Sequence, residues 1–349
     1  MRLPAHGANP HRLYEAMQMN MPSSYIDFSV NVNPMQYEYI ITEQQWLRWM
    51  SEYPEERSES LQTMIAERER VARSHVFVGN GAAQCIYLLA EQFAGQHIGV
   101  IEPTFTEYRR ACEAYGCIVH SFMLDEHWQP PIEQMIESLP SLHALFVCHP
   151  NNPTGTIWPK ETMYALLKAA NDEGVYVIVD EAFYDFWLDG YSVSSFLPTF
   201  DRLIVLRSLT KMYRLAGVRL GYVLAHEHVV KKLTEKQPPW SVNTIAQQIG
   251  KQLLNDEAFV ERTKTYIASE RKRIFSQFTE LGYRYSPSVV NFYMLHDETM
   301  TLFPFLLQHG MVVRHTFNFQ GLDGKYIRLA IRTKEENDRL LHYLKRWNK

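Results

Sequence analysis

The sequence predicts an α/β protein with two parts: a large domain built on a sheet covered by helices on both faces, and a smaller α+β domain. Between residues 74 and 225, short apolar runs rich in β-branched residues alternate with longer segments of helical spacing. After the two prolines at 238–239, this alternation gives way to a long charged helical stretch, 255–281, then to short strands and a final helix. A chain of 349 residues is long enough for about two domains of ordinary size.

The apolar runs are the predicted strands of the large sheet, at 75–78, 98–101, 118–122, 144–148, 175–179, 203–206 and 221–224. Three segments between them have helix length and amphipathic spacing, at 82–93, 106–115 and 160–173. Sheets of this kind bind ligands beyond the carboxyl ends of their strands. The residues that directly follow the runs are therefore the candidates for function.

We divide the chain into three segments. Residues 1–38 contain four prolines and little periodicity, and are expected to form an irregular arm that packs with the small domain. Residues 39–238 are expected to form the large, cofactor-binding domain, and residues 239–349 the small domain.

The composition is that of an ordinary globular protein: 46% hydrophobic, 21% charged, with a net charge of -4. It does not favour disorder or nucleic-acid binding. No CxxC pair occurs, so the four cysteines are expected to be buried thiols and no metal is expected. The start of the chain lacks the apolar core of a signal peptide, and no apolar stretch reaches roughly 18 residues. We therefore expect a cytoplasmic protein that does not bind membranes.

Four polar segments follow predicted strands and carry the candidate chemistry. The first is the turn Gly79-Asn80-Gly81, which leads from a strand into a helix beginning near Ala82. Backbone N–H groups at such a turn can bind a phosphate, although Gly-Asn-Gly also forms ordinary tight turns.

The second segment runs from His149 to Gly155 and contains two prolines that fix the loop. Its amide side chain at Asn152 can donate to a ring hydroxyl of an aromatic cofactor; an Asn-Pro turn without a ligand is the alternative reading.

In the third segment, Asp180 ends a buried apolar strand, where a carboxylate is costly without a cationic partner. A protonated pyridine nitrogen would be such a cationic partner. A metal ion is the alternative, but the Gly-x-x-x-x-Gly-Lys loop that would accompany a metal-binding carboxylate of this kind does not occur in the sequence.

The fourth segment is Arg207-Ser208-Leu209-Thr210-Lys211, followed by Arg219. A lysine at the end of a buried strand can have a depressed pKa, so that its amine attacks an aldehyde. Ser208 and Arg219 flank it and can bind a phosphate. A β-lactamase-type reading of Ser-x-x-Lys would need partner motifs that this chain lacks. Together the four segments predict a site for pyridoxal 5′-phosphate (PLP).

The sequence resembles the class I/II aminotransferases, which have the aspartate aminotransferase fold (fold type I), and within them the histidinol-phosphate aminotransferase branch. The resemblance extends from Asn31-Val32-Asn33-Pro34 to residues 332–337. The resemblance implies a homodimer with shared active sites. It implies that Asn152 bonds the cofactor O3′, Asp180 its pyridinium and Lys211 its C4′, that Tyr108 stacks on its ring, and that its phosphate is bound by Ser208, Arg219 and the backbone at Gly81 and Ala82. It also implies that Tyr53 reaches the cofactor phosphate of a neighbouring subunit and that Arg328 binds the substrate carboxylate.

One residue departs from the family pattern. Phe183 stands where the family commonly has a tyrosine that gives O3′ a second hydrogen bond. The adjacent Tyr184 is expected to point the other way.

Several features resemble the threonine-phosphate decarboxylase group of that branch. They are His6-Gly7-Ala8-Asn9, Asp27-Phe28-Ser29, Asp180-Glu181-Ala182-Phe183, Ser208-Leu209-Thr210-Lys211 and Asn318-Phe319-Gln320-Gly321-Leu322. The resemblance implies decarboxylation of L-threonine O-3-phosphate to (R)-1-aminopropan-2-ol O-phosphate, in cobalamin biosynthesis. A His-Gly-x-Asn turn can bind a phosphomonoester, or else be a terminal tip with no ligand. The candidate contacts for the substrate phosphate are His6, Gly7, Asn33 and Arg314.

Two other functions stay open at this point. Transamination of histidinol phosphate or another amino acid would use the same residues, because it differs from decarboxylation only in which bond at Cα is aligned. A PLP-binding regulatory module without catalysis is the third reading, and it would need a DNA-binding segment or a missing lysine.

Overall fold

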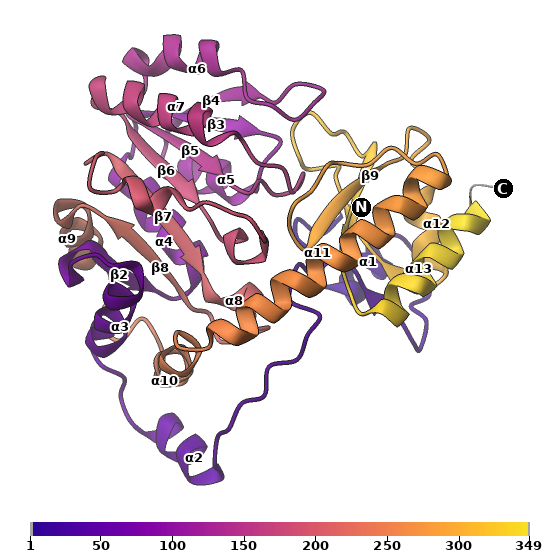
Figure 1. Ribbon diagram of the computed structural model, residues 1–349, viewed down its shortest axis with the longest axis horizontal. Helices are drawn as coiled ribbons and strands as arrows, with labels where there is room; N and C mark the ends of the chain where they lie inside the picture. Colours follow the sequence, from indigo (N-terminus) through magenta and orange to yellow (C-terminus); the bar gives the residue numbers. More distant parts are fainter. Residues whose placement is uncertain (1–2, 348–349) are drawn as a thin grey trace.

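The large domain is built on one seven-stranded sheet, which confirms the predicted fold class. The computed structural model describes residues 3–347 of the chain (Figure 1). The strand order is β2-β8-β7-β6-β5-β3-β4, and β8 alone is antiparallel to its neighbours. The strands are β2 (Val76–Gly79), β3 (His97–Glu102), β4 (Ile118–Met123), β5 (Ala144–Cys148), β6 (Tyr176–Asp180), β7 (Leu203–Ser208) and β8 (Gly221–Ala225).

Helices cover both faces of this sheet because its central strands are apolar on both sides. Phe146 and Ile178 pack on one face with α4, α5 and α9, whereas Val147 and Val179 pack on the other with α3, α6, α7 and α10. The helices are α3 (Glu59–Glu69), α4 (Gly81–Gln92), α5 (Glu107–Ala114), α6 (Ile132–Ser138), α7 (Lys160–Asp172), α8 (Leu209–Met212), α9 (Glu227–Lys236) and α10 (Thr244–Leu253).

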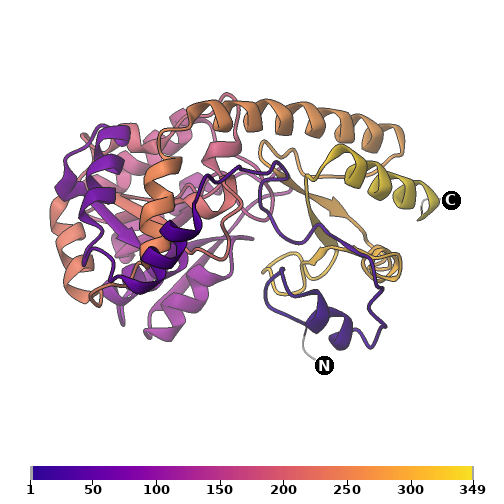
Figure 2. The same cartoon turned by 90° about the horizontal axis from the view of Figure 1, so that it is seen from below.

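The small domain contains a three-stranded antiparallel sheet in the order β11-β12-β9. Its elements are β9 (Phe292–His296), β10 (Met311–Val312), β11 (Arg314–His315), β12 (Tyr326–Ala330), α12 (Leu302–Gln308) and α13 (Lys334–Trp347). The long helix α11 (Glu257–Glu280) runs from the large domain to the small one (Figures 1 and 2). This helix matches the charged stretch predicted at 255–281.

The N-terminal arm lies against the small domain. Its helix α1 (Pro10–Ala16) is tied to α12 by Tyr14, whose hydroxyl donates to the carbonyl of Leu307 at 2.7 Å. Its strand β1 (Ile26–Asp27) pairs in parallel with β10. The next helix, α2 (Glu43–Ser51), projects from the body of the molecule and has no buried residue (Figure 1).

The boundary between the two domains differs from the predicted one at residue 239. Helix α10 packs on the large domain, where the Gln247 side chain donates to the carbonyl of Glu55 at 2.9 Å and to Ser58 Oγ at 3.0 Å. A side chain at Gly250 would meet Leu220 at 2.6 Å, so the glycine allows this close approach. The chain therefore leaves the large domain in α11 and not at the proline pair.

Four short 3-10 helices complete the described elements: η1 (Arg73–His75), η2 (Leu139–Ser141), η3 (Tyr184–Phe186) and η4 (Val193–Phe196). Within residues 3–347, no helix has both the length and the apolar character that spanning a membrane would need. The four cysteines are all buried and free.

Candidate active site

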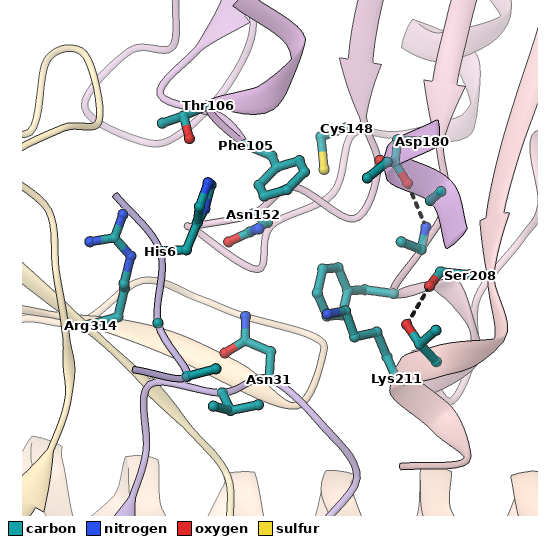
Figure 3. Close-up of a pocket in the computed structure, with 18 of the residues that line it drawn as sticks. His6, Asn31, Phe105, Thr106, Cys148, Asn152, Asp180, Ser208, Lys211 and Arg314 are labelled. Atoms are coloured by element: carbon teal, nitrogen blue, oxygen red, sulfur yellow. Dashed lines mark hydrogen bonds between the residues drawn. The ribbon is translucent and has the colours of Figure 1, made fainter. Parts of the chain in front are cut away.

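A cavity of about 370 Å³ lies between the carboxyl ends of the central strands, the arm and the small domain. It brings together residues that are up to about 320 positions apart in the chain, because both domains and the arm contribute to its wall. The predicted site residues that line it are His6, Gly7, Ala82, Tyr108, Asn152, Asp180, Ser208, Lys211, Arg219, Arg314 and Arg328. Figure 3 shows Asp180, Ser208 and Lys211 on one side, with His6, Asn31 and Arg314 on the other.

Lys211 lies in α8, directly after β7, and its side chain reaches the cavity. Its pKa is lowered to about 8, first because it is shielded from water and then because the guanidinium groups of Arg328 and Arg219 repel its positive charge. A larger fraction of the amine is therefore neutral near neutral pH than in an ordinary lysine, as a nucleophile requires.

Asp180 ends β6 and is 4% exposed. Its Oδ2 accepts from the Tyr108 hydroxyl at 2.7 Å, and its Oδ1 accepts from the backbone N–H of Ala182 at 2.9 Å. Burial raises the pKa of this carboxyl group, while the Tyr108 hydrogen bond lowers it. A cation against the carboxylate would offset the cost of burial.

The Tyr108 ring stacks on Phe146, with a centroid distance of 5.3 Å and an interplanar angle of 15°. The sequence indicated only that Tyr108 would stack on a cofactor. Its hydrogen bond to Asp180 is an additional contact, made across 72 positions in the chain.

A cradle for a phosphate forms where α4 begins beside Ser208 and Arg219. Gly81 has φ +77°, and a Cβ there would meet Arg219 Nη2 at 2.7 Å. Only glycine allows both this backbone conformation and this approach. The helix has no side-chain cap at its N-terminus, so its first N–H groups are available to an anion. Thr210 Oγ1 lies 2.9 Å from Ser208 Oγ at the same place.

Arg328 is 7% exposed and spans two sides of the cavity. Its Nη1 donates to Asn152 Oδ1 at 2.6 Å, and its Nη2 donates to the carbonyl of Ser29 at 2.8 Å. Its buried Nε has no hydrogen-bond partner among the described residues. Burial and the neighbouring Arg314 lower its pKa to about 9. Because Asn152 uses its oxygen on Arg328, its amide nitrogen can donate to a ligand.

The aromatic residues after Asp180 have the predicted orientations. Phe183 lines the cavity and packs edge-on against Phe292 with a centroid distance of 4.7 Å. Tyr184 stacks instead on the Arg207 guanidinium, 4.4 Å from its ring centroid. Asn152 is therefore the side chain placed to bond a ring hydroxyl here, without a second hydroxyl donor from residue 183 or 184.

The choice of Asn33 as a phosphate contact needs correction. This residue is fully buried and does not line the cavity. Its amide nitrogen donates to the Met212 carbonyl at 2.8 Å and to Thr263 Oγ1 at 2.9 Å, and its oxygen accepts from the Met35 N–H. Asn33 thus joins the arm to the core and has no free group for a ligand.

The residue that sequence reasoning missed is Asn31, two positions earlier. It lines the cavity, is 4% exposed, and neither of its amide atoms has a hydrogen-bond partner among the described residues. A buried, unsatisfied amide costs free energy unless a ligand completes it. In an extended segment, residues two positions apart point to the same side, so the sequence pattern places both asparagines on one side and does not distinguish between them.

Besides Asn33, two predicted site residues lie outside the cavity lining, Gly81 and Tyr53. Gly81 has no side chain, and this leaves room for the guanidinium of Arg219, which does line the cavity. Tyr53, just after the end of α2, is 82% exposed and contacts Trp240 with a centroid distance of 5.1 Å and the two rings tilted by 48°. Tyr53 therefore contributes nothing to the site of its own chain.

The sequence profile of the family "Aminotransferase class I and II" matches residues 28–344. The chain belongs to this family. It is 31% identical to threonine-phosphate decarboxylase of Salmonella typhimurium over 98% of this chain and 96% of the relative. It is 32% identical to histidinol-phosphate aminotransferase of Pyrococcus furiosus over 84% of this chain and 82% of the relative. The chain is therefore a PLP-dependent enzyme of the decarboxylase or aminotransferase type.

Solved structures agree with this assignment. A decarboxylase from Sulfurospirillum multivorans has a TM-score of 0.87 and 26% identity, covering 100% of this chain and 94% of that one. A double mutant of Thermus thermophilus aspartate aminotransferase, 21% identical, has a TM-score of 0.82 over 99% of this chain and 97% of that one. The fold is the predicted aspartate aminotransferase fold.

The residues of the cavity fit pyridoxal 5′-phosphate, the cofactor of this family. The cradle at Gly81 and Arg219 suits its phosphate, the neutral amine of Lys211 suits its aldehyde, and the buried carboxylate of Asp180 suits its pyridinium. Bound there, the cofactor supplies a sink for the electron pair released at the substrate Cα.

The lowered pKa of Lys211 leads to a first prediction. With a pKa of about 8, roughly one amine in ten is neutral at pH 7, compared with roughly one in three thousand for an unperturbed lysine. In the cofactor-free protein, acetylation of Lys211 should therefore rise with pH and reach its half-maximal rate near pH 8. Competitive labelling with acetic anhydride, followed by mass spectrometry, measures this midpoint against N-acetyl-lysine methylamide.

Arg328→Gln provides the internal comparison, because it removes one of the positive charges that face Lys211. This variant should shift the midpoint to higher pH. A wild-type midpoint equal to that of the reference amine would contradict the assignment of Lys211 as the activated nucleophile.

Proposed function

We propose that this enzyme decarboxylates L-threonine O-3-phosphate to (R)-1-aminopropan-2-ol O-phosphate. One observation carries the proposal: Arg314 and Arg328 are direct partners on β11 and β12, and both are buried. Like charges directly opposite each other destabilise a sheet, and buried charges without partners cost several kcal/mol. No carboxylate within residues 3–347 forms an ion pair with either one, although the negative charge of Asp27 acts on Arg328, so the pair favours an anionic ligand.

The charges around the cavity support a substrate with two anionic groups. The lining contains four lysine or arginine side chains and a single acidic side chain, Asp180. Arg219 is placed for the cofactor phosphate and Arg328 for the substrate carboxylate. Arg314, which pairs with no acid, is left for another anion.

A second anion subsite is defined by His6, Asn31 and Arg314, which lie together across the cavity from Asp180 and Ser208 (Figure 3). It offers an imidazole, an unsatisfied amide and a guanidinium, as well as the backbone of Gly7. Binding a phosphate monoester, with close to two negative charges near neutral pH, requires several such donors. The alignment with the Salmonella decarboxylase, which covers 98% of this chain, includes most of the arm that supplies His6.

The residues then have distinct roles in the proposed reaction. Arg328 binds the carboxylate and holds its bond to Cα in the orientation in which it breaks. Asp180 keeps the cofactor nitrogen protonated, so that the electron pair of the broken bond can be delocalised. Carbon dioxide leaves, and the amine of Lys211, as its conjugate acid, delivers a proton to Cα.

Transamination is the second candidate, favoured by the similarity to histidinol-phosphate aminotransferases. It would use the same residues, with Lys211 moving a proton from Cα to the cofactor, and would give a carbonyl compound: a 2-oxo acid from an amino acid, or a ketone from histidinol phosphate. Both candidates place a phosphate at His6, Asn31 and Arg314. They differ in which bond at Cα breaks.

The reaction is tested by supplying L-threonine O-3-phosphate labelled at its carboxyl carbon, with and without 2-oxoglutarate. We expect labelled carbon dioxide in an amount equal to the aminopropanol phosphate formed, independent of 2-oxoglutarate. Formation of a 2-oxo acid that requires 2-oxoglutarate, without carbon dioxide, would show that the enzyme is an aminotransferase.

The second anion subsite is tested by deleting residues 1–10. The deletion removes the contacts from His6 and Gly7 to the substrate phosphate, so the KM for phosphothreonine should rise about a hundredfold, at roughly 1.5 kcal/mol for each of two charge-assisted contacts. Cofactor binding, followed by its absorbance, should stay intact, and turnover of an unphosphorylated amino acid should change little. Equal processing of phosphothreonine by the truncated and full-length proteins would exclude the arm as a phosphate ligand.

We also propose that the enzyme is a homodimer in which Tyr53 reaches the partner's cofactor phosphate. The exposed apolar side chains of α2 and its surroundings support this, because Leu47, Met50 and Tyr53 are 57%, 64% and 82% exposed, with Trp240 beside them. Such a patch on a projecting helix is typical of a surface that becomes buried on association. A second copy of the chain is the occupant that would give Tyr53 a role at an active site.

Mixing two impaired variants tests this shared site. In a hybrid of Tyr53→Ala and Lys211→Ala subunits, one of the two sites has both residues intact. Random exchange should therefore restore up to about a quarter of the wild-type activity. Absence of recovery after verified subunit exchange would contradict a site shared through Tyr53.

A further inference from the structure

His6 contacts an acidic residue outside the machinery described so far. Its Nε2 lies 2.8 Å from Oε1 of Glu107, the first residue of α5. Glu107 is 9% exposed and does not line the cavity, although its neighbours Thr106 and Tyr108 do. It therefore reaches the substrate region only through His6.

Glu107 is held as a charged carboxylate by its surroundings. Arg110 donates to the same Oε1 at 2.6 Å, and the Tyr87 hydroxyl donates to Oε2 at 3.1 Å. The hydrogen bond from His6, followed by the positive charge of Arg110, lowers the pKa of the carboxyl group despite its burial. A carboxylate in the first turn of a helix is also favoured by the helix dipole.

The backbone beside His6 is fixed from the opposite side. The carbonyl of Ala5 accepts from Arg314 Nη2 at 2.6 Å and from the Asn318 amide at 3.0 Å. The small domain thus holds the arm at Ala5, while Glu107 of the large domain holds the ring of the next residue. Figure 3 shows the His6 ring between Arg314 and the large domain's Phe105.

We propose that Glu107 is a positioning residue for the substrate phosphate, acting through His6. In this proposal the carboxylate accepts the Nε2–H of the imidazole at 2.8 Å, in preference to the Arg110 Nη1 that lies 3.2 Å from the same nitrogen, and Nδ1 is left to donate to the phosphate. This inference rests on the proposed function, because it requires that His6 binds the phosphate of the substrate.

The physical reason is the protonation of the ring. A neutral imidazole that donates from Nε2 has a lone pair on Nδ1, which repels a phosphate oxygen. Both nitrogens can donate only in the imidazolium form, in which the ring would lie between two anions, the carboxylate of Glu107 and the phosphate of the substrate. Glu107 therefore acts on His6 in two ways: it fixes the orientation of the ring, and it places a negative charge beside it.

Glu107→Gln separates these two effects. The glutamine oxygen can still accept from Nε2, so the arm keeps its anchor while the negative charge is lost. In the PLP-loaded enzyme, the change in cofactor absorbance measures binding of phosphothreonine whether carbon dioxide or a 2-oxo acid is formed. We expect its Kd and KM to rise about tenfold in Glu107→Gln, with kcat within about twofold of wild type.

Three comparisons make the test specific. L-Threonine without phosphate should bind equally well to wild type and to Glu107→Gln. Glu113→Gln, which changes an exposed residue of the same helix that pairs with Arg109, should behave as wild type with both ligands. In a His6→Ala background, Glu107→Gln should cause no further loss for phosphothreonine, because the ring through which it acts is absent.

The outcomes distinguish this inference from the proposed function. If His6→Ala weakens phosphothreonine binding but Glu107→Gln does not, the carboxylate is only an anchor for the arm and the inference is overturned. An equal loss for threonine and phosphothreonine would also overturn it, as would an additive effect in the double variant. If wild type binds phosphothreonine no better than threonine, the phosphate subsite itself is refuted, and the role of Glu107 with it.

Discussion

An excess of buried positive charge organises the active site of this enzyme. Lys211, Arg314 and Arg328 converge on one cavity, together with Arg219 and against the single acidic side chain of Asp180. Each cation is costly to bury alone, and the lowered pKa values of the first three reflect that cost. The same repulsion keeps the amine of Lys211 reactive and leaves the two arginines ready for anions. Binding and chemistry thus have a common electrostatic origin.

The N-terminal arm connects the two domains across this cavity. It follows the small domain through β1 and β10, and through the contact of Ala5 with Arg314, and it touches the large domain through His6 and Glu107. Because the arm contacts both domains, residues that would bind the distal end of a substrate are fixed relative to those that bind the cofactor. A few charge-assisted hydrogen bonds can therefore determine which substrates fit.

Much of the large domain could be predicted from the sequence, because its determinants are local. A buried parallel strand needs a continuous apolar run, and the polar residue that ends the run must then lie at the edge of the sheet where ligands bind. This placed Asn152, Asp180, Ser208 and Lys211 at the cavity. The position of the domain boundary was harder to predict, because α10 joins the large domain through hydrogen bonds of Gln247 with residues about 190 positions earlier.

By itself, the sequence determined the fold class, the cofactor and the residues at the strand ends that line the cavity, because each of these follows from a strand, a turn or a helix start. Only the tertiary structure decided that Asn31 and not Asn33 faces the cavity, that Arg314 and Arg328 are paired, and that His6 rests on Glu107. The pairing of Arg314 with Arg328 depends on the register of β11 on β12 within the small domain, and the other two choices depend on the packing of the arm against two domains. Contacts between residues about a hundred or more positions apart are set by that packing and leave no periodic signal in the chain.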